Sequence, residues 1–123
     1  MSYSIFLSDD RKYIVLEITG EITAKAIMQM IIESHAFGAK NQISKYLVDA
    51  TRARNTSTIS ENYQFAYGNM KETPEINQNA IVAMLVDPED HTHDFIETVS
   101  RNAGYNAKMF RNREEAITFL TAE

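Results

Sequence analysis

The chain has 123 residues, with 12 Lys and Arg against 17 Asp and Glu, so its formal net charge is −5 at pH 7. Hydrophobic residues make up 44% and charged residues 24%, which excludes disordered, collagen-like and coiled-coil classes and favours one globular domain over residues 1–123. The chain has no cysteine, so disulfides, thiolate nucleophiles and cysteine-ligated metals are excluded, and its acidic balance disfavours nucleic-acid partners.

The first third of the chain predicts a hairpin followed by a helix. Residues 3–7 and 13–19 are β-branched and aromatic runs joined by a polar turn. Ile14, Leu16 and Ile18 alternate with more polar neighbours, which is typical of a strand with one buried face. We expect Gly20 to end this strand and helical spacing to run from residue 22 to about 36, before Gly38 breaks it.

The middle of the chain predicts a strand, a helix and a second strand. Residues 43–48 form the first of these, which ends on Asp49 and leads into a polar loop at residues 51–57. Thr58 and Glu61 have capping-box spacing and start a helix that Pro74 stops. Residues 80–86 are continuously apolar, which indicates a strand covered on both faces.

The last part predicts helix, strand and helix. Asp87 and Pro88 fit an N-cap with a first-turn proline, for a helix that ends at Gly104. Residues 107–110 form a short strand, and residues 112–115 cap a final helix. The order β-β-α-β-α-β-α-β-α predicts an α/β domain. Its sheet should be mixed but mostly parallel, with about five strands, an N-terminal antiparallel hairpin and helices on both sides.

The layout resembles the SpoIIAA-like branch of the STAS domain family over nearly the whole chain. Residues 20–23 at the start of the first helix match it, but the closing pattern at residues 104–116, followed by Phe119 and Leu120, carries most of the resemblance. The resemblance implies a single SpoIIAA-like domain with a regulatory or protein-interaction role rather than an enzymatic one. The expected partner is another protein or a second copy of the chain.

The same resemblance bears on phosphorylation and on small ligands. Members of the wider family include anti-sigma factor antagonists, which are switched by phosphorylation in an Asp-Ser-Ser/Thr-Gly segment at the start of the second helix. The corresponding residues 55–60 lack the Asp and the Gly, so Ser57 or Thr58 is at most a positional counterpart, and we read the switch motif as absent. The related CRAL-TRIO lipid carriers suggest an alternative function, a pocket between helices and sheet for an apolar or amphipathic small molecule.

Candidate binding residues gather after the third predicted strand. Asp49, Thr51, Arg52 and Arg54 lie at a strand end, where open α/β sheets carry ligand sites, and arginines there can hold a phosphate or a carboxylate bidentately. The alternative is that these arginines have no binding role and are solvated or paired with nearby acids. These four residues, together with Ser57 and Thr58, are our candidates for a ligand or partner site.

The segment of residues 87–94 is a weaker candidate for a metal or hydrolase site, because histidine and carboxylates together can bind divalent ions. His91 and His93 are two residues apart and would point to different sides of a helix, so only Asp87, His91 and Asp94 share a face. Acids also favour a helix N-terminus for dipole reasons alone. We therefore expect no cofactor and no metal.

The distribution of charge, three apolar residues and the lack of export signals give three further expectations. Residues 87–97 hold five acids and no Lys or Arg, whereas residues 98–113 hold four cations and no acid, so the acidic stretch suits a basic partner. Met30, Phe37 and Phe65 fall outside a single helical stripe and, if exposed together, would mark a dimer face or a ligand mouth. Without a signal peptide or a run long enough to span a bilayer, we expect a cytoplasmic location.

Overall fold

The computed structural model describes residues 2–56, 61, 77, 79–102 and 104–122 and forms a five-stranded sheet in the order β1-β2-β3-β4-β5. β1 is antiparallel to β2, and all later neighbours pair in parallel. The elements are β1 (Ser2–Leu7), β2 (Ile14–Ile22), α1 (Ala24–Asn41), β3 (Lys45–Asn55), β4 (Ile81–Leu85), α3 (Asp94–Asn102), β5 (Asn106–Phe110) and α4 (Arg113–Thr121). The predicted α/β class with an antiparallel first hairpin is confirmed, whereas the helix predicted from residue 58 lies outside the described residues.

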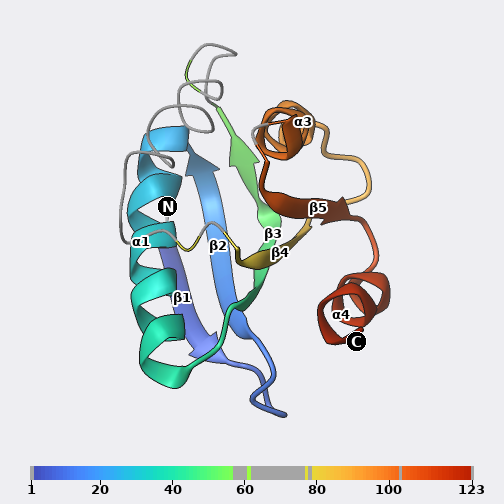
Figure 1. The fold of residues 1–123 in the computed structure, drawn as a ribbon. Helices are drawn as coiled ribbons and strands as arrows, with labels where there is room; N and C mark the ends of the chain where they lie inside the picture. Colours follow the sequence, from blue (N-terminus) through green and yellow to red (C-terminus); the bar gives the residue numbers. More distant parts are fainter. Residues whose placement is uncertain (1, 57–60, 62–76, 78, 103, 123) are drawn as a thin grey trace.

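Helices cover both faces of the sheet, as predicted. α1 lies alongside β1 and β2, and α3 lies next to β5 (Figure 1). The core on the α1 face is built from Leu16, Ile18, Ile22, Ile27, Met30, Ala50, Ala53 and Val86. The core on the α4 face is built from Tyr13, Val15, Leu47, Ala83, Leu85, Ala116 and Leu120. The alternation read from β2 therefore sends its side chains to two separate cores.

β2 and β3 both extend further than predicted. Gly20 does not end β2. It has a φ of 96° and pairs with Ala53 of β3, and pairing continues to Ile22 and Asn55. Thr51, Arg52 and Arg54 consequently lie in a strand rather than in a loop. The register shifts between Glu17 and Thr19, where β3 has one more residue than β2, so both Ala50 and Ala53 reach the same core.

Two helix boundaries also differ from the prediction. α1 continues through Gly38, where an added Cβ would lie 2.0 Å from the Tyr46 hydroxyl oxygen, so this glycine permits close packing rather than ending the helix. The helix instead ends at Asn41 and is capped by Gln42, which has a left-handed conformation. α3 begins at Asp94 and not at Asp87, whereas Asn112 caps α4 as expected, accepting a bond from the Glu115 amide at 3.1 Å.

The apolar residues that fall outside a helical stripe in the sequence do not form an exposed cluster in the described part of the structure. Met30 is buried in the α1-face core, and Phe37 is partly buried against Tyr46 and its neighbours. Phe65 lies outside the described residues. Among the described residues, the large hydrophobic side chains that are exposed are Tyr3 and Phe6, both on the edge strand β1.

Candidate functional site

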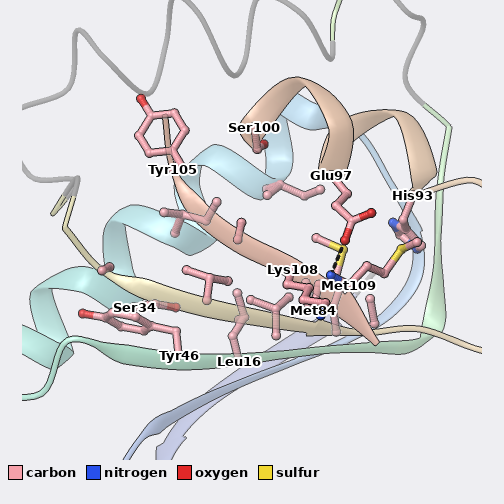
Figure 2. A pocket seen from close by; sticks show the side chains of 18 of the residues that line it. Leu16, Ser34, Tyr46, Met84, His93, Glu97, Ser100, Tyr105, Lys108 and Met109 are labelled. Carbon is pink, nitrogen blue, oxygen red and sulfur yellow. Dashed lines mark hydrogen bonds between the residues drawn. The ribbon is translucent and has the colours of Figure 1, made fainter. Parts of the chain in front are cut away.

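A cavity of about 100 Å³ lies between the sheet, α1 and α3. Figure 2 shows α3 on one side of this space, with Glu97 and Ser100 directed toward the strands opposite. The sheet side is largely aliphatic and is formed by Leu16, Ile18, Val48, Val82, Met84 and Met109. Ile27 and Ile31 of α1 complete an apolar lining, so this space favours an apolar occupant.

His93 is the most deeply buried polar side chain of this lining, with an exposed fraction of 0%. Its Nε2 lies 3.0 Å from the carbonyl oxygen of Ala53 and 3.6 Å from a carboxylate oxygen of Asp90. Both neighbours are acceptors, so we assign the ring proton to Nε2. Nδ1 is buried and has no hydrogen-bond partner. A buried polar atom in that state is costly, so it is a candidate ligand contact.

Tyr105 supplies a second unpartnered polar atom to the same lining. Its hydroxyl oxygen is buried without a hydrogen bond, and burial raises the pKa of the phenol. Tyr105 and His93 lie toward opposite ends of the cavity in Figure 2. Sequence reasoning missed both roles, because neither a loop histidine nor a tyrosine after Gly104 carries a periodic signal.

His35 and Tyr46 form the cavity wall at the far end of α1. Their rings are stacked, with centroids 4.6 Å apart and planes inclined by 6°. The backbone amide of Asn77 donates to His35 Nδ1 at 2.8 Å, so that nitrogen is an acceptor. Burial lowers the pKa of His35 to about 4, and the ring is therefore neutral at physiological pH.

Glu97 ties α3 to the sheet beside the cavity. One of its carboxylate oxygens accepts a hydrogen bond from the backbone amide of Met109 in β5, the contact drawn as a dashed line in Figure 2. Because a charged acceptor strengthens such a bond, this contact helps to fix the distance between α3 and the strands. Its role is to position the wall rather than to react.

Asp49 and Thr51, two of the predicted site residues, come together on the opposite face of the sheet. Asp49 is 5% exposed and accepts bonds from the Thr51 hydroxyl at 2.7 Å and the Thr51 amide at 3.1 Å. Its other oxygen pairs with Arg113 of α4. Burial acts to raise the pKa of this carboxyl, but the bonds from Thr51 and the charge of Arg113 outweigh it and hold the pKa below its ordinary value. This cluster anchors α4 to β3.

Arg52 and Arg54 are not part of that buried cluster. Both are exposed on β3, opposite Thr19 and Glu21 of β2, and their positive charges lie beyond the buried part of the strand. Within the described ranges neither guanidinium forms a hydrogen bond or an ion pair, but the charge of Arg54 is close enough to Asp90 to help lower the pKa of that carboxyl. The structure thus separates the predicted set into a buried anchor and an exposed cationic pair.

The acidic stretch finds its main partner within the chain. Arg111, from the basic stretch, donates to the carbonyl oxygens of Asp87 at 2.8 Å and Asp90 at 2.9 Å, and to the Asp94 carboxylate at 2.9 Å. His91 Nδ1 lies 2.9 Å from the other oxygen of Asp94. The guanidinium therefore supplies the positive charge that holds the loop of residues 87–93 together.

This arrangement also bears on the proposed metal ligands. Residues 87–93 are not helical, so Asp87, His91 and Asp94 do not share a helix face as predicted. Asp87 accepts a bond from the Glu89 amide at 2.9 Å, His91 is exposed, and His93 points into the core. Within the described ranges, no group of three or more His, Asp or Glu side chains is placed to hold a metal ion.

Comparison with known proteins places the fold. No protein-family model matches the sequence, and no curated protein sequence matches it. Among solved structures, an uncharacterised protein of the DUF3478 family from Shewanella loihica, with a SpoIIAA-like fold, matches with a TM-score of 0.54 at 20% identity. That match covers 97% of this chain and 92% of the other. The anti-sigma factor antagonist SpoIIAA in its unphosphorylated form matches with a TM-score of 0.54 at 15% identity, over 99% and 100% of the two chains.

The chain has a SpoIIAA-like fold of the STAS type. The phosphorylated form of the Bacillus cell fate determinant SpoIIAA also matches, with a TM-score of 0.51 at 15% identity, over 94% of this chain and 96% of the other. The resemblance read from residues 104–116 is thereby confirmed at the level of fold. Within this SpoIIAA-like fold, Ser57 and Thr58 lie outside the described residues. No helix of the described part is long and apolar enough to cross a bilayer.

Proposed function

We propose that this chain is a small regulatory domain that works by binding another protein and has no catalytic role of its own. The support is the SpoIIAA-like fold, which matches an anti-sigma factor antagonist over essentially the full length of both chains. Because residues 55–60 lack the Asp and Gly of the phosphorylated segment, we propose that binding is not controlled by that switch. A second copy of the chain is the alternative partner.

The observation that carries this proposal is the exposed pair Arg52 and Arg54. Two exposed guanidinium groups on one strand surface can each bind a carboxylate through two hydrogen bonds. Such a surface is electrostatically suited to an acidic partner and would speed the encounter with it. The buried Asp49 carboxylate and the half-exposed Arg113 guanidinium join this part of β3 to α4.

The test is affinity capture combined with cross-linking in extracts of the source organism. We expect a defined partner to be retained by the wild type and lost from the double variant Arg52→Ala/Arg54→Ala. The matched control is Lys40→Ala/Arg101→Ala, which removes the same charge from two exposed positions on helices. Equal retention by all three proteins would contradict the proposed surface, and sedimentation equilibrium separates a foreign partner from self-association.

A second function is supported by the cavity. We propose that it binds a small apolar or amphipathic molecule, because aliphatic side chains of α1 and the sheet surround a space of about 100 Å³. An engineered apolar cavity of about 150 Å³ stays dry and binds benzene, so an occupant of that size or smaller is physically reasonable. Within the described residues, the cavity is bounded by α1, α3 and the sheet.

This second function is tested by titrating benzene into isotope-labelled protein and following backbone NMR shifts. Ala107 lines the cavity, and we expect Ala107→Leu to fill the space and abolish the shifts. Ala39→Leu, on the exposed surface of α1, is the matched control and should bind benzene as the wild type does. Benzene binding that is unchanged by Ala107→Leu would place the site elsewhere.

A further inference from the structure

We infer that this cavity selects a small, neutral, apolar molecule that carries one N–H or O–H donor, which it binds through Nδ1 of His93. The inference rests on the second function proposed above and specifies the chemistry of its ligand. It depends on three features of the described residues, namely the tautomer of His93, the burial of Nδ1 and the volume and lining of the cavity.

The tautomer of His93 decides what Nδ1 can do. Nε2 faces two acceptors, the Ala53 carbonyl oxygen at 3.0 Å and the Asp90 carboxylate at 3.6 Å, so we assign the ring proton to Nε2. In the neutral ring Nδ1 is then an acceptor with a free lone pair. Its accessible area is negligible and no described group donates to it. An occupant with a donor would satisfy this atom, whereas a purely apolar occupant would leave it unpaired.

The cavity restricts the rest of the ligand. About 100 Å³ accommodates a ring no larger than benzene, and the aliphatic floor of β2 to β5 offers dispersion contacts but few polar ones. A water molecule needs two to four polar partners to be held well. Nδ1 supplies one, and the other unpartnered atom, the Tyr105 hydroxyl, lies toward the opposite end of the cavity (Figure 2). The space therefore favours an apolar body with a single donor over a cluster of water molecules.

Pyrrole and furan provide a matched pair of ligands for the test. They have nearly the same size and shape, but pyrrole carries an N–H donor and furan does not. We expect pyrrole to bind the wild type roughly three- to tenfold more tightly than furan, the factor that one net hydrogen bond provides. Binding is measured by NMR titration of the full chain, and the ¹⁵N resonance of His93 Nδ1 should move with pyrrole and not with furan.

Two variants locate the anchor. His93→Phe keeps a ring in the wall but has no acceptor at the Nδ1 position, so the preference for pyrrole should disappear while furan binding persists. Tyr105→Phe removes the other unpartnered buried polar atom of the lining and should retain the preference. Preference that survives His93→Phe, or that is lost in Tyr105→Phe, would overturn the assignment to His93.

The remaining outcomes separate this inference from the function on which it rests. If pyrrole and furan bind the wild type equally, the cavity is a ligand site without a polar anchor, and only the inference fails. If neither ligand binds, nor benzene, both fail. An Nδ1 resonance that already shows a hydrogen bond before any ligand is added identifies water as the occupant and also overturns the inference.

Discussion

Protonation of His35 should make the stability of this protein fall steeply in mild acid. Burial beside Tyr46 lowers the pKa of His35 from 6.5 to about 4. Between these two values the unfolded chain binds a proton at this residue that the folded chain does not. Stability from this source is therefore complete above about pH 7, decreases as the pH falls through 6.5 toward 4, and changes no further below 4.

The size of the effect follows from the two pKa values. Each pKa unit corresponds to about 1.4 kcal/mol, so the full difference amounts to about 3 kcal/mol. At pH 4.5, most of it, about 2 kcal/mol, should already be lost relative to pH 7. For a domain of this size that is a substantial fraction of the total stability.

The assay compares urea unfolding at pH 7 and pH 4.5 for the wild type and His35→Phe. Phenylalanine keeps a ring to stack on Tyr46 but cannot titrate, so the loss between the two pH values should be about 2 kcal/mol smaller in the variant. Tyr46→Phe is the control, since it removes the hydroxyl bond to the Ile43 carbonyl without removing a group that titrates in this range. If His35→Phe shows the same pH dependence as the wild type, His35 is protonated without penalty in the folded state and the reasoning is wrong.

Five further substitutions test the packing that positions the cavity, the α4 face and the loop of residues 87–93. Asp49→Asn should lose about 2 kcal/mol at pH 7 by denaturant unfolding, a deficit that shrinks as the pH falls below 3.8, because the folded state holds the pKa of this carboxyl below that value. Arg113→Ala should lose less, since that side chain is 52% exposed. Gly38→Ala should lower the melting temperature by the equivalent of about 1–3 kcal/mol through overpacking, whereas Gly104→Ala, with open space around it but a φ of 99°, should cost about 1 kcal/mol. Arg111→Ala should speed amide hydrogen exchange in residues 87–93, and unchanged exchange there would contradict its role in holding that loop.

Most of the fold could be predicted because its signals are local. The alternation of Ile14, Leu16 and Ile18, the unbroken apolar run that becomes β4 and the Asn112 cap each reflect which side chains must be buried or must satisfy a helix end. These requirements act over a few residues, so they can be read without knowing what packs against them. The chain order of the elements then predicts the parallel sheet.

The errors fall where a distant segment changes a local preference. In the sequence, Gly20 is typical of a strand end and Thr51 of a loop. Pairing between β2 and β3 nevertheless extends both strands past these residues. Gly38 interrupts a helical pattern in the sequence, yet α1 passes through it because the Tyr46 hydroxyl needs the space. Asp87 has the features of a helix cap, but Arg111, 24 residues later, holds that segment as a loop.

The candidate sites show the same division. By itself the sequence determined the fold class, the boundary of one acidic and one basic stretch, and the position of Asp49 on a strand, because composition and periodicity encode these directly. Only the tertiary structure decided that Asp49 is paired with Arg113, that the acidic stretch is held by Arg111, and that His93 reaches a cavity with one ring nitrogen unpartnered. The physical reason is that burial and hydrogen bonding of a side chain depend on neighbours from other elements, which local spacing does not specify.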